Sequence, residues 1–177
     1  KNYPSFISIN KSKITKTLKQ NPFIKDVQIK KNFKFQITIN VTEEKVVAYN
    51  LTNQSYLLSN GTYINDKNFL GVPQLNNYTP EDVLKNFAEE LGKLDEDIIA
   101  DISEIEYSPS KNETGETIDS TRFKLKMKDG NTVYINVKKC NVLSYYNQIY
   151  ASLKDKKGVL NLDSGNYERY VLTLYEE

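Results

Sequence analysis

The sequence predicts an α+β protein in which a small helix–hairpin unit is followed by a larger mixed, mainly antiparallel β domain with flanking helices. Short runs of apolar residues alternate with polar residues, as in half-buried strands. Pairs such as Asn60-Gly61 and Asp129-Gly130 join neighbouring runs, and such tight turns favour antiparallel pairing. Two further stretches carry apolar residues at helical spacing, which indicates helices packed against the sheet.

Residues 1–50 form the first expected unit. Ser8 or Asn10 can cap a short helix, which should stop before Pro22 because the residue preceding a proline is pushed out of the α region. Two strands of a hairpin are then predicted from alternating apolar residues: Val27 and Ile29, then Phe35, Ile37, Ile39 and Val41. About 50 residues are too few for an independent core.

Residues 51–177 form the expected β domain, which opens on a hairpin with a type I′ turn at Asn60-Gly61. Thr79 should cap the next helix, with Pro80 in its first helical position. The inward face of this helix is predicted from its spacing: Val83, Leu84, Phe87 and Leu91. A strand is expected over residues 102–107, and the polar residues that follow it, 108–121, are predicted to form a loop.

The rest of this domain is predicted as a hairpin, a helix and two strands. The hairpin turns at Asp129-Gly130, and the helix follows from apolar residues spaced between 143 and 153. Strands are expected over 159–163 and 170–175. The second of these is unusually apolar, and a strand of this kind at a sheet edge can pair with a partner strand. A central strand without a partner explains the same pattern equally well.

The composition excludes several kinds of active site. The chain has 177 residues, 24 basic and 23 acidic side chains, no His and one Cys. Without His there is no Ser–His–Asp or Cys–His relay, and one Cys cannot complete a Cys/His zinc site or an internal disulfide. The chain begins with Lys and has no apolar stretch near the roughly 20 residues that cross a bilayer, which indicates a soluble piece of a longer protein.

The charge is unevenly distributed. Residues 1–50 hold ten Lys and three acids, a balance of +7, while residues 51–177 hold the other 14 basic and 20 acidic residues, a balance of −6. A basic first unit suits an anionic membrane or wall polymer, although a solvated Lys-rich face is favoured by about two to one. Nucleic acid is not expected, because only two of the basic residues are Arg, the residue that specific base readout favours.

No catalytic chemistry is predicted, nor any cofactor, metal or small-molecule substrate. Cys140 lies near the start of a helix, but without His a buried structural thiol is the better interpretation. A dense group of acids offers the only carboxylates for general acid–base hydrolysis, and a solvated face is about nine times the better interpretation. These acids are Asp95, Glu96, Asp97, Asp101, Glu104 and Glu106.

The order of motifs resembles a known family. Residues 21–27 and 35–43 are similar to the turn and closing strand of a polypeptide-transport-associated (POTRA) domain, and Val47-Ala48 is similar to the exit from this domain in bacterial cell-division proteins of the FtsQ/DivIB family. That family usually has Pro where this chain has Lys34 and Val46, and its POTRA domain begins with a strand and helix that are missing here. Later segments resemble its β domain in order: 57–63, 72–75, 102–105, 125–137 and 160–165.

This resemblance implies a truncated POTRA-like domain over 1–50 and an FtsQ/DivIB-type β domain over 51–177. It implies a single-pass membrane protein, with this part on the extracellular face of the cytoplasmic membrane at the division septum. The lone Cys, with no disulfide, fits an exported protein of a Gram-positive bacterium. It implies a non-enzymatic scaffold of the divisome that binds the coiled-coil partners FtsL and DivIC (or FtsB). The partner-binding edge maps by position to Leu160, Leu162, Asp163, Tyr167, Tyr170, Val171, Leu172, Thr173, Leu174 and Tyr175.

Two other functions remain open from the sequence. A POTRA-type chaperone or interaction module of a secretion system shares the first unit, although such systems repeat the domain and this chain has no internal repeat. A carbohydrate-active enzyme would use the acidic group, and substituting Asp97 or Glu104 would then abolish its activity.

Overall fold

The computed structural model describes residues 6, 8–65, 69–153, 156–164 and 171–175, and it confirms the α+β class. The chain forms two compact units, Lys1–Lys45 and Val46–Glu177. The sequence placed the boundary after residue 50, whereas the strand Val46–Asn50 pairs within the second unit. The first unit holds α1 (Lys11–Leu18), β1 (Ile24–Lys31) and β2 (Ile37–Glu43).

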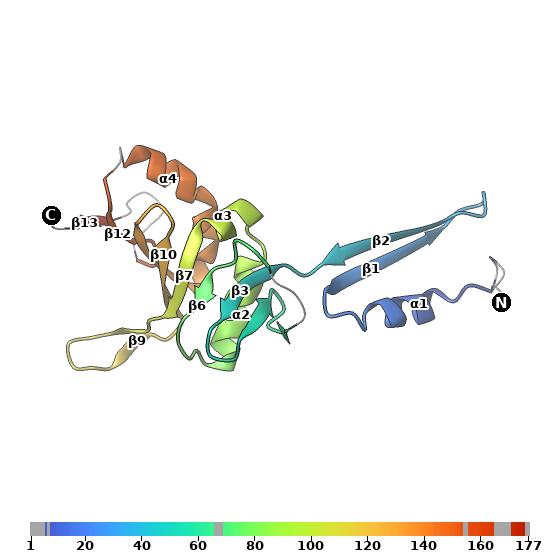
Figure 1. Cartoon of the computed structure of the whole chain (residues 1–177), viewed down its shortest axis with the longest axis horizontal. Coiled ribbons are helices and arrows are strands. Elements are labelled where there is room, and N and C mark those ends of the chain that lie inside the picture. Colours follow the sequence, from blue (N-terminus) through green and yellow to red (C-terminus); the bar gives the residue numbers. More distant parts are fainter. Residues whose placement is uncertain (1–5, 7, 66–68, 154–155, 165–170, 176–177) are drawn as a thin grey trace. The chain divides into compact units, whose positions relative to one another are not determined.

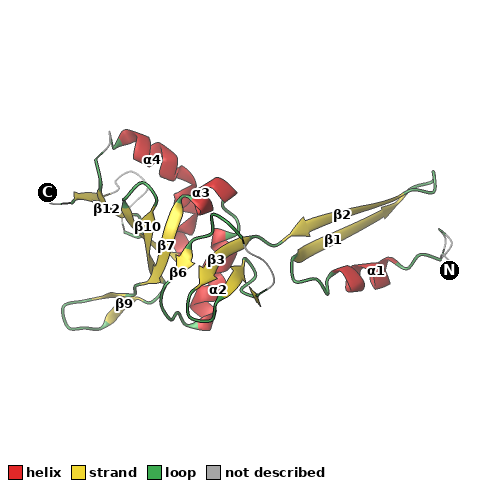
Figure 2. Ribbon diagram, viewed as in Figure 1, coloured by secondary structure: helices red, strands yellow, loops and turns green. Residues whose placement is uncertain are grey.

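In its described residues, the second unit is built on one nine-stranded sheet and three α-helices (Figures 1 and 2). The sheet order is β13-β12-β11-β10-β7-β6-β3-β4-β5, and β8 and β9 form a separate pair. Five of the neighbouring pairs in the large sheet are antiparallel, and three are parallel: β3 with β6, β6 with β7, and β11 with β12. The strands are β3 (Val46–Asn50), β4 (Ser55–Leu58), β5 (Tyr63–Ile64), β6 (Gln74–Leu75), β7 (Ile102–Tyr107), β8 (Ser110–Lys111), β9 (Thr117–Asp119), β10 (Arg122–Met127), β11 (Thr132–Asn136), β12 (Gly158–Asn161) and β13 (Val171–Leu174); the helices are α2 (Glu81–Leu91), α3 (Glu96–Ala100), the 3₁₀ helix η1 (Val137–Tyr145) and α4 (Tyr146–Ser152).

The first unit is a helix beside a two-stranded hairpin (Figure 1). Of the two predicted caps, Asn10 begins α1, and its side-chain oxygen accepts a hydrogen bond from Lys13 N at 3.1 Å. The prediction that Phe35 belongs to the second strand was wrong. Phe35 lies in the turn with φ 56°, a conformation usually taken by Gly, and its side chain is 74% exposed. The turn is closed by a hydrogen bond from Asn32 N to Gln36 O, so the strand begins only at Ile37.

Helices cover one face of the large sheet. The predicted inward residues of α2 are all buried, and the ring of Phe87 stacks on Phe123 of β10 with 3.8 Å between centroids. Along β10, Phe123, Leu125 and Met127 point into this core and alternate with basic side chains on the other face. The period-two pattern of β10 and β11 is therefore confirmed, and it leaves the second face of the sheet polar.

Strand β7 departs from the expected alternation because it contains a bulge. Ile102 and Ile105 are both buried although they lie three residues apart. Opposite them, the register shifts between Lys126 and Met127 of β10. One extra residue in β7 therefore turns both Ile side chains toward the same core.

The predicted type I′ turn at Asn60-Gly61 was wrong. Only Gly61 has a positive φ, at 83°, whereas a type I′ turn requires two such residues. Leu58 O accepts from Gly61 N at 2.9 Å, and Leu58 N donates to Thr62 O at 2.9 Å. These bonds define a three-residue loop with Gly in the left-handed position, and the turn at Gly130 has the same pattern.

Two further predictions for this unit need correction. Helix α2 begins at Glu81 rather than Pro80, because Pro80 keeps an extended ψ of 137°, and the Thr79 hydroxyl does not cap it. Instead this hydroxyl is buried, without a hydrogen-bond partner among the residues described. Residues 108–121 are not only a loop, since β8 and β9 form a two-stranded arm that extends from the sheet (Figure 1). Its residues are largely exposed, so the sequence showed no alternation of apolar and polar residues that would predict these strands.

Cys140 is fully buried in η1, and burial raises the pKa of its thiol from 9.0 to about 12. We expect a thiol reagent at about pH 8 to modify Cys140 only after unfolding, because the thiolate is the reactive form. The contribution of this thiol to stability is complete below pH 9.0 and is lost as the pH rises toward about 12, because the unfolded chain then gives up the proton first. Equal labelling rates in buffer and in denaturant would contradict the burial of Cys140.

Candidate functional site

The candidate site is the sheet edge formed by β12 and β13. These strands pair in antiparallel fashion, with Gly158 opposite Leu174 and Leu160 opposite Leu172. β13 is the last strand in the sheet order, and no described strand pairs with its outer side. Among the described residues, β13 therefore lies at the edge of the sheet, which favours the edge alternative that the sequence left open for 170–175.

The backbone groups on the outer side of β13 have no pairing strand among the described residues. Tyr175 N donates to Lys157 O at 3.2 Å, so this pair of residues is hydrogen-bonded across the ladder. Hydrogen-bonded and non-hydrogen-bonded pairs alternate along antiparallel strands. Leu174 and Leu172 therefore belong to non-hydrogen-bonded pairs, and their N–H and C=O groups point away from β12. Such a row of groups is a template for another strand.

The predicted site residues divide into a buried and an exposed set. Leu160 and Leu162 are fully buried, and Leu172 packs partly buried against the same core. Thr173 is exposed, and Leu174 and Tyr175 are 49% and 45% exposed. Val171 pairs with Asn161 through the backbone. Two other predicted residues, Tyr167 and Tyr170, lie outside the described part of the chain.

Asp163 is held by a residue that the sequence did not mark as part of the site. Its Oδ2 lies 2.6 Å from Nε of Arg122, and both side chains are mostly buried. The Arg122 guanidinium also lies 3.7 Å from the ring centroid of Tyr134. Tyr134 O in turn accepts from the backbone N–H groups of Leu162 and Asp163. Arg122 and Tyr134 thus fix the end of β12, and the only signal in the sequence was their outward position on predicted strands.

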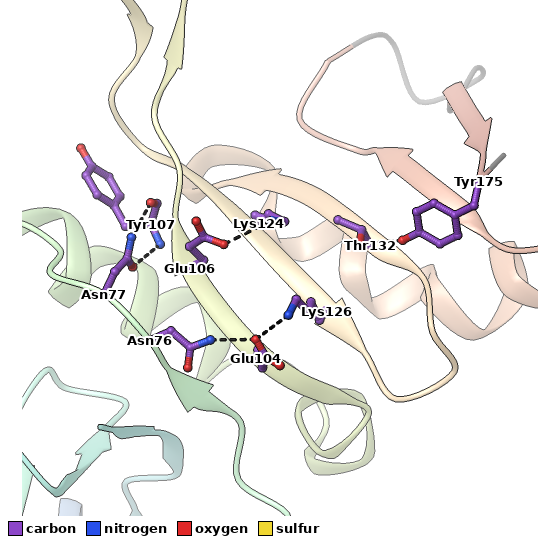
Figure 3. Close-up of polar contacts among 9 residues, drawn as sticks. All are labelled: Asn76, Asn77, Glu104, Glu106, Tyr107, Lys124, Lys126, Thr132 and Tyr175. Carbon is purple, nitrogen blue, oxygen red and sulfur yellow. Dashed lines mark hydrogen bonds and ion pairs between the residues drawn. The ribbon is translucent and has the colours of Figure 1, made fainter. Parts of the chain in front are cut away.

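Two contacts fix β13 against its neighbours. The Tyr175 hydroxyl lies 2.7 Å from Thr132 Oγ1 of β11, so Tyr175 reaches across β12 (Figure 3). Gly158 allows a close approach of the two backbones, because a Cβ at this position would lie only 2.1 Å from Thr173 O. Gly158 is therefore required by the packing of β13.

The polar face in the middle of the sheet carries ion pairs between β7 and β10 (Figure 3). Lys126 contacts Glu104 at 2.9 Å, and Lys124 contacts Glu106 at 3.3 Å. The hydrogen bond from Lys126 lowers the pKa of Glu104, and a further bond from Asn76 acts in the same direction. Two members of the acidic group are therefore engaged in cross-strand pairs, and the described residues contain no group of three His, Cys, Asp or Glu placed to hold a metal ion.

The FtsQ-type POTRA domain model matches residues 1–44 of the chain. The cell division protein DivIB of Listeria monocytogenes is 31% identical over 169 residues, which are 91% of this chain and 60% of that protein. DivIB of Bacillus subtilis is 31% identical over 169 residues, or 92% of this chain and 62% of that protein. The chain thus spans about three fifths of the length of these relatives.

A solved structure shows the same fold. The major extracytoplasmic domain of DivIB from Geobacillus stearothermophilus matches with a TM-score of 0.50 and 24% sequence identity. The match covers 64% of this chain and 96% of that domain. Among the described residues, no helix combines the length and the apolar character needed to cross a membrane.

Proposed function

Because the chain belongs to the FtsQ/DivIB family of bacterial cell division proteins, we propose that it acts as a non-enzymatic scaffold of the division machinery. In this proposal it lies on the extracellular face of the cytoplasmic membrane at the septum. It binds membrane-anchored coiled-coil partners of the FtsL and DivIC/FtsB type through the β12–β13 edge. The relatives reported above are named as cell division proteins, not as enzymes, which supports a structural role.

The observation that carries the proposal is the outer side of β13, along which no strand of the described residues pairs. Leu172 and Leu174 direct backbone donors and acceptors away from the sheet, and an extended partner segment can satisfy them by adding as a tenth strand. Backbone hydrogen bonds then supply affinity, while exposed side chains at 173–175 supply specificity. The buried residues Leu160 and Leu162 hold the edge in place rather than contact the partner.

We also propose a second, electrostatic contact for the first unit. The four lysines of α1 and its C-cap, Lys11, Lys13, Lys16 and Lys19, are all exposed. Lysines near an anionic membrane surface each contribute about 1 kcal/mol of attraction, and this attraction weakens as salt is added. A vesicle-binding measurement at two salt concentrations tests this contact separately from partner binding.

A proline substitution tests strand addition directly. Leu174→Pro removes an N–H that points outward, so the β12–β13 ladder keeps its own hydrogen bonds. We expect this variant to bind a purified FtsL–DivIC extracellular pair at least tenfold more weakly than the wild type, measured by calorimetry. That loss corresponds to about 1.4 kcal/mol.

The matched control is Leu174→Ala, which removes the same side chain but keeps the N–H. It should bind within a few-fold of the wild type. Equal binding by the proline variant would move the partner site away from β13. No binding by the folded wild type would contradict the proposed function and favour a POTRA-type module of a secretion system.

A further inference from the structure

A buried side chain outside the edge connects it to the rest of the sheet. Asn131 follows the tight turn between β10 and β11, where Met127 N donates to Asn131 O at 2.9 Å. Its own side chain is buried and reaches across to the start of β12. There, Asn131 Oδ1 accepts a hydrogen bond from Gly158 N at 3.0 Å. The N–H of the first residue of β12 is thus held by a side-chain acceptor.

The orientation of this amide is set from its other end. Asn131 Nδ2 donates to the Tyr146 hydroxyl of α4 at 3.2 Å, and that hydroxyl donates to Asp129 Oδ2 at 2.6 Å. Asp129 Oδ1 accepts from Asn131 N at 2.9 Å, so the turn closes on itself. Burial raises the pKa of Tyr146 well above its usual range, and its phenol stays protonated as a donor. Rotation of the amide would bring its NH₂ group against the N–H of Gly158, which fixes the acceptor toward β12.

Gly158 links the Asn131 side chain to the edge strand β13. It pairs with Leu174, and its Cα has no room for a side chain because Thr173 O and the Leu174 Cα lie directly against it. The parallel ladder between β11 and β12 begins one residue later, where Thr132 pairs with Val159. At this end of β12, the Asn131 side chain is therefore a buried polar contact that ties the strand carrying β13 to the turn between β10 and β11.

We propose that Asn131 is a positioning residue for the partner-binding edge, linking the turn at Asp129 and helix α4 to β12 and β13. This inference rests on the proposed function, because it assigns Asn131 a role in presenting that same site. Its position is buried, so it acts on the partner only through Gly158 and the strand beyond it.

The test compares two Asn→Ala variants. Asn131→Ala leaves the Gly158 N–H without its acceptor in a buried place. Asn77→Ala is a matched control, because the Asn77 side chain also braces a strand through two backbone bonds, to N and O of Tyr107 in β7. Both variants are measured for binding of the purified FtsL–DivIC extracellular pair and for amide hydrogen exchange.

With Asn131→Ala, we expect affinity to fall about tenfold and exchange to accelerate at Gly158 and along β13, while β7 and β10 stay protected. With Asn77→Ala, we expect wild-type affinity and unchanged exchange at the edge. Equal losses of affinity in both variants, or unchanged exchange at β13 in Asn131→Ala, would overturn the inference.

Absence of binding by the folded wild type would instead overturn the proposed function. The exchange data would still decide whether Asn131 positions the edge, so the two failures are distinguishable.

Discussion

Replacing Phe123 by Ala is expected to lower the free energy of unfolding of the second unit by about 3–5 kcal/mol. The Phe123 ring is fully buried, stacks on Phe87 of α2 and meets the Tyr107 ring edge-on at 5.6 Å. Truncation removes this apolar surface and leaves a cavity between the helix and the middle of the sheet. Domains are stable by only about 5–15 kcal/mol, so a loss of this size removes a large share of the total.

The measurement is urea unfolding followed by far-UV circular dichroism, because the chain has no Trp to report on the core. Ile118→Ala on the β9 arm is the control. It removes a side chain that is 70% exposed, and we expect a change within about 0.5 kcal/mol. A loss below about 1 kcal/mol for Phe123→Ala would show that the core collapses to fill the site.

Replacing Gly158 by Val is expected to abolish partner binding while most of the sheet remains folded. The Cβ of any side chain at this position would overlap Thr173 O and the Leu174 Cα, and both are backbone atoms that cannot turn aside. The strain is relieved most easily by separating β13 from β12, since β13 pairs with no other described strand. Overpacking of this kind costs about 1–3 kcal/mol.

We expect at least a hundredfold loss of affinity for the FtsL–DivIC pair by calorimetry, equivalent to about 2.7 kcal/mol. Gly115→Ala is the control, since Gly115 has φ 86° at the tip of the arm and open space around its Cα. Its cost is limited to local backbone strain. Retained affinity in Gly158→Val would mean that the partner does not depend on the pairing of β13.

The strong periodic signals in the sequence predicted the centre of the fold correctly. Phe87 and Leu91 face the core from α2, and Phe123 and Val133 face it from β10 and β11, as their spacing indicated. Short elements were not predicted, because a strand of two residues such as β6 is too short to show a period. The types of the turns were also not predicted correctly. The Gly at Asn60-Gly61 predicts a turn, but the number of residues in the loop depends on how the flanking strands pair.

The candidate site was predictable only in part, for a different reason. The apolar run along 170–175 indicates a strand, but an edge strand and a central strand share that pattern, and only the order of the sheet distinguishes them. Leu160 and Leu162 were placed in the site by position, whereas their burial assigns them to the core. Asn131 and Gly158 carried no signal, because their importance lies in contacts between segments about 27 residues apart.

The parallel pairing of β11 with β12 also has a consequence for how the chain folds. The hairpins β3–β4–β5 and β10–β11 close over short loops, whereas the chain between β11 and β12 passes through η1 and α4. Contacts between segments far apart in the chain tend to form late, because the conformational entropy of the intervening loop is lost before the contacts stabilise the structure. We therefore expect β12 and β13 to assemble after the rest of the sheet. A partner that adds to β13 would then bind only those molecules of this protein in which folding is complete.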